Sequence, residues 1–331
     1  MQSRLATSVF VLALLLMSSV ILYFTKDIMI PFVLSLFLVY TIQPAIRFFQ
    51  KRFKINRSIA LPIVLILVVV GFVIIFAAVG HSLRQIAANS EQYQAKVLRA
   101  LDLVTNFVND SGILADETPD LRELVSSLPI FGFLSKISGA IFNGISDFTL
   151  IAIFSLFLMT GKQIGIPKDG LIEKANQSVR GYLTTKLLTS LATGSLTAIF
   201  FFIVDLEMAF MFGLLAFLLN FIPTIGSIFA TLLPLPIALL QFSNPTLIVL
   251  SLVIPGSIQF TIGNVIEPKI IGQNLDLHPI TILLSLMFWG ILWGIPGMFL
   301  ATPITVICRL FLANSTRYEG FAELMSGRIK F

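Results

Sequence analysis

Charged side chains are scarce in this chain of 331 residues: Asp, Glu, Lys and Arg make up 12% of it, whereas 56% is hydrophobic. A water-soluble fold could not bury that much apolar surface. The apolar residues form runs of the roughly 20 residues that cross a hydrocarbon layer about 30 Å thick. The alternating strands typical of outer-membrane barrels are missing. The composition therefore predicts an all-α polytopic membrane protein.

Cysteine and histidine are equally rare. Cys308 is the only cysteine, which excludes an intrachain disulfide, and two histidines with one cysteine argue against a zinc site. The sequence contains no P-loop, which argues against ATP as the driving force. It also contains no recognisable set of nucleophile, base and acid of the kind that enzymes use. We therefore expect a protein that is not an enzyme and has no cofactor and no metal.

The net charge of +5 comes from basic residues that stand mainly in short loops between apolar runs. Membrane topology explains such loops better than a nucleic-acid partner does, because Lys and Arg collect on the cytoplasmic side. The clearest basic loop follows the second apolar run and contains no acidic residue. The loop after the fourth run and the C-terminal tail are also basic. We therefore place both termini in the cytoplasm.

Eight apolar runs are predicted to form membrane segments. The first resembles a signal peptide because it follows Arg4, but it lacks a clear A-x-A cleavage site, so we interpret it as a retained helix. The runs cover residues 5–24, 28–49, 59–80, 139–160, 182–204, 208–240, 247–266 and 280–312.

Four regions follow from these runs. Residues 1–80 are expected to form three transmembrane helices, residues 137–312 a transport core, and residues 313–331 a cytoplasmic tail. Residues 81–136 are the one sizeable extramembrane piece, which the topology places outside. Its apolar residues recur at helical spacing (Val97, Leu101, Val104, Val108), and a turn is expected at 110–119. We interpret it as a helical hairpin packed on the membrane domain or on a neighbouring subunit; a specific binding role is the alternative.

Two runs, 208–240 and 280–312, are too long for one crossing, and proline and glycine interrupt both. Such helices should kink, unwind or turn back as re-entrant hairpins, and the pattern does not choose among these forms. Backbone groups freed at the breaks are candidate ligand groups. The breaking residues are Pro223, Gly226, Pro234 and Pro236 in the first run, and Gly290, Gly294, Pro296, Gly297 and Pro303 in the second.

A short internal similarity links the two broken runs. Gly226 and Gly297 each begin the pattern G-x-x-x-A-T, with Ile-Pro shortly before it and proline soon after. Paired broken segments in corresponding positions point to a transporter site. The alternative is that glycine and alanine simply allow close helix packing, as Gly290-x-x-x-Gly294 would.

The seventh run carries an unusual polar face. Gly256, Gln259, Gly263 and Glu267 share one side of a regular helix, with Asn264 beside them and Pro268 directly after. A carboxylate inside the bilayer costs roughly 2.5–3.5 kcal/mol, so Glu267 is a candidate proton or cation acceptor. The alternative places it at the interface, where it pairs with Lys269 or caps a helix.

Two further polar residues are candidates. His278 is a candidate proton relay, because an imidazole ordinarily changes its charge near neutral pH. The alternative is that His278, which directly precedes Pro279, orients a turn. Asn220 precedes the break at Pro223 and would contact solute or form a helix–helix hydrogen bond. Asp205 and Glu207 are interpreted as solvated charges of a short outer loop.

Three sequence blocks resemble the signature blocks of the autoinducer-2 exporter family of PerM-like permeases. The resemblance covers nearly the whole chain, and one departure is Pro296, where a non-proline residue is expected. The blocks are Asn220-Phe-Ile-Pro-Thr-Ile-Gly226, Asn264-Val-Ile-Glu-Pro-Lys-Ile-Ile-Gly-Gln-Asn-Leu-Asp-Leu-His-Pro279 and Gly294-Ile-Pro-Gly-Met-Phe-Leu-Ala-Thr-Pro303.

The resemblance implies a secondary transporter of about eight helices in the bacterial inner membrane, assembled as a homo-oligomer. Some members export the quorum-sensing signal autoinducer-2, and others are sodium or lithium/proton antiporters. We therefore expect a permease for a small solute such as autoinducer-2, coupled to protons or cations; an Na⁺(Li⁺)/H⁺ antiporter, a passive channel and a non-transporting scaffold are the alternatives. The candidate residues are Asn220, Pro223, Gly226, Gln259, Asn264, Glu267, Pro268, His278 and Gly297.

Overall fold

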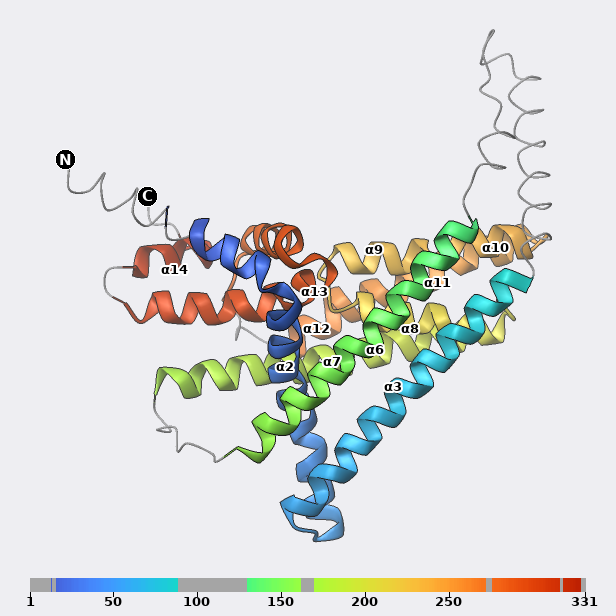
Figure 1. Ribbon diagram of the computed structural model, residues 1–331. Coiled ribbons are helices and arrows are strands. Elements are labelled where there is room, and N and C mark those ends of the chain that lie inside the picture. Colours follow the sequence, from blue (N-terminus) through green and yellow to red (C-terminus); the bar gives the residue numbers. More distant parts are fainter. Residues whose placement is uncertain are drawn as a thin grey trace.

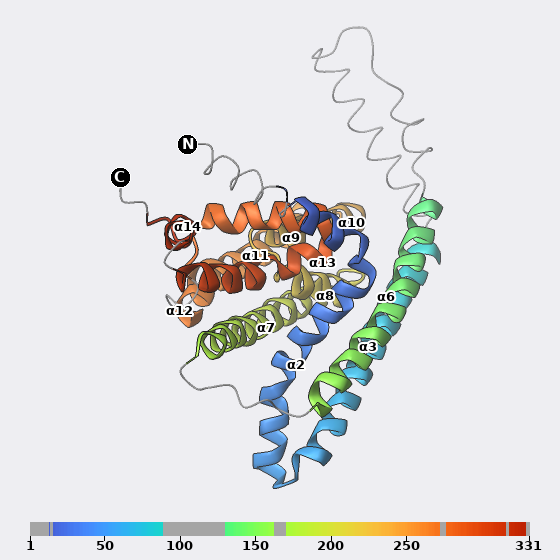
Figure 2. The same ribbon diagram turned by 60° about the vertical axis from the view of Figure 1, so that its left-hand side comes forward.

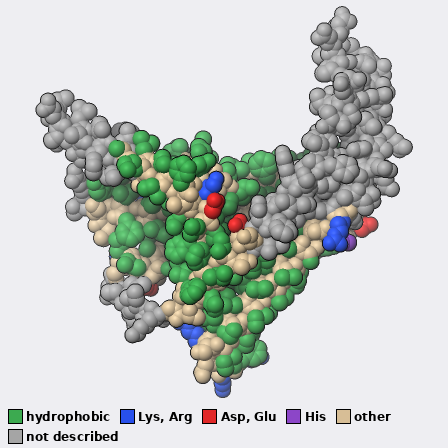
Figure 3. Space-filling model, viewed as in Figure 1, with side chains coloured by type: hydrophobic (Ala, Val, Ile, Leu, Met, Phe, Trp, Pro, Cys, Tyr) green, Lys and Arg blue, Asp and Glu red, His purple; other side chains and the backbone are tan. Residues whose placement is uncertain are grey.

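The structure, a computed structural model, describes residue 13 and the ranges 16–88, 130–161, 170–271, 276–315 and 318–328. These residues form helices and no strand. Five helices are long and apolar enough to cross a membrane, and shorter apolar helices accompany them. Large hydrophobic side chains cover much of the surface in Figure 3. The chain is thus an all-α polytopic membrane protein, as its composition predicts.

The described N-terminal residues include three long helices: α2 (Lys26–Phe53), α3 (Arg57–Ala88) and α6 (Ile130–Thr160). In Figures 1 and 2, α3 and α6 run side by side as an arm that leads away from the other helices. Of the first predicted run, residues 16–24 are described, and they are helical. The predicted helix at 97–108 and the turn at 110–119 lie outside the described residues.

Helix α7 (Leu171–Ile203) packs against α2, α8, α11 and α13 and therefore forms the centre of the C-terminal part. Its backbone touches that of α8 (Ala209–Leu219), where a Cβ on Gly194 would lie 2.7 Å from the carbonyl oxygen of Gly213. Only glycine permits so close an approach. Most residues of α7 that face these neighbours are small or polar.

The overlong run 208–240 is a helical hairpin, which we call hairpin 1 (residues 205–241). It consists of α8, α9 (Ile225–Leu232) and α10 (Leu235–Gln241). The two ends meet, because the Gln241 side chain accepts a hydrogen bond from the Glu207 amide at 2.7 Å and donates one to the Asp205 carbonyl at 2.6 Å. The two ends of hairpin 1 therefore lie on the same side of the protein.

The run 280–312 also folds back, at Gly294, whose φ of 65° interrupts α13 (Pro279–Ala313). Ser285 Oγ donates to the carbonyl oxygen of Ala301 at 3.2 Å. A straight helix would separate these two residues by about 24 Å. Residues 276–313 are therefore a second hairpin, hairpin 2, and of the arrangements that the sequence allows, the structure has a hairpin in both runs.

The tips of the two hairpins meet inside the protein. The rings of Phe221 and Phe299 stack with centroids 4.4 Å apart, and Ile222 packs against Leu286 and Ala301. Figure 1 shows the hairpins approaching from opposite directions, with α10 far from α14 (Glu319–Met325). Gly226 and Gly297 both lie near the start of a second arm, so the sequence similarity corresponds to equivalent positions in two similar hairpins.

The chain between the hairpins returns along α7 as α11 (Pro245–Thr261), a π-helical turn η1 (Ile262–Ile266) and α12 (Glu267–Ile271). This segment carries the chain from the side of hairpin 1 to the side of hairpin 2. Helix α14 then packs on hairpin 2.

Candidate functional site

A buried ion pair joins α7 to α12. Lys186 Nζ lies 2.7 Å from Oε1 and 2.9 Å from Oε2 of Glu267, and the two side chains are 5% and 13% exposed. Thr189 Oγ1 lies 3.5 Å from Oε2 of the same carboxylate. Charges are buried in proteins only when they are paired in this way. The pair is therefore the centre of the candidate site, and Lys186, not Lys269, is the partner of Glu267.

Sequence reasoning missed Lys186, although a signal was present. It is the only charged residue in the apolar run 182–204. An ionisable residue inside a membrane segment is by default a functional candidate with a partner elsewhere. Lys186 lies one helical turn inside that run and near the midpoint of α7 (Leu171–Ile203), so the pair is at the middle of this helix.

The π-helical turn η1 aims Glu267 at α7. Eight residues of regular α-helix rotate about 80° beyond two full turns, which would carry Glu267 away from the face of Gln259. A π turn rotates less per residue, and such turns are common at functional sites. With η1 between them, Gln259 is buried and Glu267 reaches Lys186. Asn264, within the turn, is exposed and donates to the carbonyl of Phe260 on its own helix.

The turn of hairpin 1 reaches α7 one helical turn beyond the ion pair. Asn220 Nδ2 donates to Ser190 Oγ at 3.0 Å, and both side chains are buried. Consecutive turns of α7 thus hold two different elements by polar contacts, α12 through Lys186 and hairpin 1 through Ser190.

Several buried polar atoms near these contacts have no hydrogen-bond partner. Both side-chain atoms of Gln259 are in this state, as are the hydroxyls of Tyr182, Thr197 and Thr302. Native proteins pair nearly all buried polar groups. The side chains therefore retain hydrogen-bonding capacity for a ligand or water.

Other predicted residues serve the hairpins or lie at the surface. A Cβ on Gly226 would lie 1.7 Å from the Leu219 carbonyl oxygen, and one on Gly297 would lie 2.0 Å from that of Trp289. Pro223 stands in the turn before α9, and Pro268 is exposed on α12. Gly226, Gly297 and Pro223 therefore shape the hairpins, and Pro268 belongs to the first turn of α12.

His278 caps α13 at some distance along the chain from the ion pair. Its Nδ1 accepts from the Ile280 amide at 3.3 Å, and its own amide donates to the Met325 carbonyl at 2.8 Å. Nearby, Asp276 accepts from Arg309 and Arg328. The surface end of hairpin 2 is thus tied to α14.

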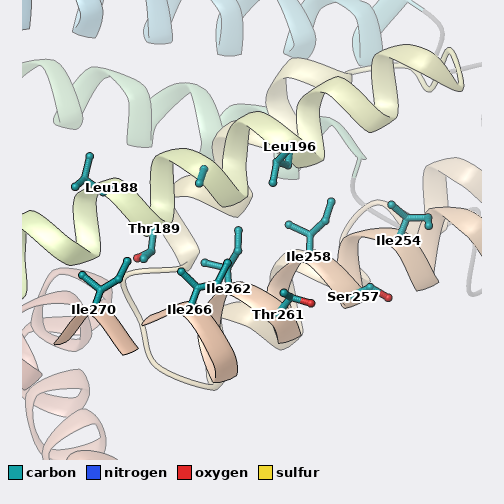
Figure 4. A pocket seen from close by; sticks show the side chains of 11 residues that line it. Leu188, Thr189, Leu196, Ile254, Ser257, Ile258, Thr261, Ile262, Ile266 and Ile270 are labelled. Carbon is teal, nitrogen blue, oxygen red and sulfur yellow. The ribbon is translucent and has the colours of Figure 1, made fainter. Parts of the chain in front are cut away.

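An apolar groove of about 430 Å³ lies between α7 and the α11–α12 segment. Figure 4 shows its labelled side chains lining the space between the two helices, with Thr189 among isoleucines and leucines. Thr189 connects this groove to Glu267. Among the described residues, His, Cys, Asp and Glu form no cluster of three that would hold a metal ion.

The family model of AI-2E family transporters matches residues 12–317. The AI-2 transport protein TqsA of Escherichia coli is 29% identical over 317 residues, which cover 92% of this chain and 90% of that protein. A protein of Borreliella burgdorferi that is named as a transport protein is 27% identical over 312 residues. The match covers 90% of this chain and 84% of that protein. A similarly named protein of Haemophilus influenzae is 28% identical over 320 residues, with 90% of each chain covered. The membrane-spanning helices of the described residues are consistent with a transporter. Because the family model matches nearly the whole sequence, the chain belongs to the AI-2E family of transporters.

Proposed function

We propose that this protein is a proton-coupled secondary transporter of a small solute such as autoinducer-2. The observation that carries the proposal is the buried Lys186–Glu267 pair, which lies one turn of α7 from the tip of hairpin 1. A pair of opposite charges is neutral as a unit and can stay buried, whereas either charge alone cannot. Protonation of Glu267 would therefore change which conformation the protein prefers.

The coupling follows from the charges. A proton on Glu267 neutralises the carboxylate and leaves the Lys186 ammonium without its counter-charge. That ammonium is then more stable in a conformation that exposes it to water, so protonation and movement of the hairpins favour each other. Loss of the proton re-forms the pair and favours the closed arrangement.

A cation antiporter is the second candidate, but the pair disfavours it. The ammonium of Lys186 already occupies the position next to both oxygens of Glu267, where Na⁺ or Li⁺ would bind. A metal cation would have to displace it against charge repulsion.

We further propose that the protein lies in a bacterial inner membrane with both termini in the cytoplasm. A hairpin that returns to the side from which it enters adds no net crossing of the membrane, so the number of net crossings stays even. The basic loop after α2 then lies on the same side of the membrane as the ends of hairpin 2 and as α14, which is the cytoplasmic side. Hairpin 1 enters from the outside and hairpin 2 from the cytoplasm.

The test is flux into proteoliposomes with an imposed pH gradient, with autoinducer-2, Na⁺ and Li⁺ as separate substrates. We expect saturable autoinducer-2 flux that the gradient drives, and its coupling should be lost in Glu267→Gln. Glu319→Gln, which neutralises an exposed carboxylate on α14, is the matched control and should behave as wild type.

Each other outcome contradicts the proposal in a recognisable way. Gradient-driven Na⁺ or Li⁺ flux alone would establish an antiporter. Rapid flux without counter-flow would establish a channel, and no flux of any substrate would indicate a scaffold. Unchanged coupling in Glu267→Gln would remove this residue from the mechanism.

A further inference from the structure

The unpartnered polar atoms lie on both sides of the ion pair along α7. Tyr182 precedes Lys186 by one helical turn, and Thr197 follows it by about three turns. Thr302, on the second arm of hairpin 2, faces the Tyr182 hydroxyl, and the interaction between the two side chains falls outside regular hydrogen-bond geometry. One group of unpartnered atoms is therefore on the side from which hairpin 2 enters.

Gln259 belongs to the other side. Helices α7 and α11–α12 run in opposite directions, and Lys186 lies opposite Glu267. Gln259 precedes Glu267 by eight residues, so it lies at the level of residue 194, between Thr193 and Thr197. Its amide and the Thr197 hydroxyl are thus on the side from which hairpin 1 enters.

Ordinary helix chemistry does not account for these atoms. Hydroxyls inside helices usually bond to a carbonyl one turn earlier, as Thr193 does to Thr189 and Ser251 does to Leu247. The hydroxyls of Thr197 and Thr302 make no such bond, and the Gln259 amide makes none either. Ser155 has the same property, but it is on α6, which packs against α2 and α3.

We propose that these side chains line the path along which solute and water cross the protein when the hairpins part. The path has two halves, Gln259 with Thr197 on the side of hairpin 1 and Tyr182 with Thr302 on the side of hairpin 2, and the Lys186–Glu267 pair separates them. This inference rests on the proposed transport function and adds its route.

The side chains also define the ligand class. Amides and hydroxyls both donate and accept hydrogen bonds, and none of them carries a charge. The two charges nearby neutralise each other. The uncharged side chains of the path therefore suit water and uncharged solutes that carry several hydroxyl or carbonyl groups.

The test is cysteine labelling from each side of the membrane, in a Cys308→Ser background that removes the native thiol. Gln259→Cys and Thr302→Cys are treated with a charged, membrane-impermeant thiosulfonate, which reacts with thiolates in water. Val253→Cys and Leu284→Cys are controls on the lipid-facing sides of α11 and hairpin 2, since these residues are 49% and 62% exposed in an apolar surface.

We expect Gln259→Cys to be labelled only from outside and Thr302→Cys only from the cytoplasm, each at least about tenfold faster than its control. Labelling at the control rate would show a dry core and overturn the inference. Labelling of both positions from one side would overturn the role of the ion pair as the divider.

A second variant covers the case in which a cysteine disturbs the fold. Gln259→Met keeps the size of the side chain and removes its hydrogen bonds. We expect a raised KM for solute at unchanged protein stability; an unchanged KM would exclude solute contact. Labelling requires neither flux nor proton coupling, so the failure of this inference is distinguishable from the failure of the proposed function.

Discussion

At the scale of single residues, Lys186 and Glu267 carry opposite charges that are both largely removed from water. Dehydrating each charge costs several kcal/mol, and their attraction offsets that cost only while both are present. The pair therefore contributes little net stability, but the loss of one member leaves the other charge buried alone. This asymmetry makes the pair suitable as a switch.

The same asymmetry gives a prediction about stability. Lys186→Met alone should lower the free energy of unfolding in detergent by about 3–5 kcal/mol, because the Glu267 carboxylate stays buried. Adding Glu267→Gln to that variant should recover most of the loss. Lys269→Met is the control, since Lys269 is exposed on the same helix as Glu267. A double variant as unstable as the single one would contradict a direct pairing.

How far the sequence predicts this site depends on the residue. Glu267 is recognisable because a carboxylate near an apolar run is unusual. Its partner is 81 positions away, and helical spacing says nothing about contacts between helices. A regular helix would place Asn264 beside the polar face. The π-helical turn η1 changes the angle between successive side chains, so Asn264 points elsewhere. The unpartnered hydroxyls of Tyr182 and Thr302 look like ordinary helix residues in sequence.

At the scale of elements, each hairpin depends on one glycine where the second arm passes the carbonyl end of the first. Gly226 faces the Leu219 carbonyl and Gly297 faces the Trp289 carbonyl, both too close for any Cβ. A backbone carbonyl cannot rotate away as a flexible side chain can. These two glycines are therefore steric requirements of the hairpins.

Gly226→Ala and Gly297→Ala should each destabilise the protein by at least about 1–3 kcal/mol, since the new methyl group forces the two arms apart. Gly71→Ala on α3 has open space around it and should be neutral or slightly stabilising, because alanine is the better helix former. Thermal unfolding in detergent distinguishes them. Equal melting temperatures for all three variants would show that the arms are not packed so closely.

The sequence predicts the positions of these breaks but not their form. Proline and glycine mark where helical hydrogen bonding ends. The direction of the following arm depends on packing between residues such as Ser285 and Ala301, which only the folded structure brings together. A kinked crossing and a hairpin have the same local signature, and for that reason the sequence left both open.

At the scale of the whole molecule, the hairpins enter from opposite sides and touch at their tips, so both routes to the interior end at one contact. Phe221 and Phe299 stack at this contact. Beside it, Asn220 holds hairpin 1 to α7. If solute passes between the hairpins, this contact has to open in every transport cycle.

Cross-linking the tips tests that requirement. Phe221→Cys with Phe299→Cys, in the Cys308→Ser background, replaces two side chains whose rings stack with centroids 4.4 Å apart. A short bifunctional thiol reagent then bridges the two cysteines through the space that the rings occupied. The cross-link should reduce solute flux to below about one tenth, because a two-state element locked in one arrangement cannot alternate. A reagent that contains a cleavable disulfide should restore flux on reduction. Each single cysteine variant, treated in the same way, should retain flux. Full flux in the cross-linked protein would mean that the tips stay together during transport and that solute passes elsewhere.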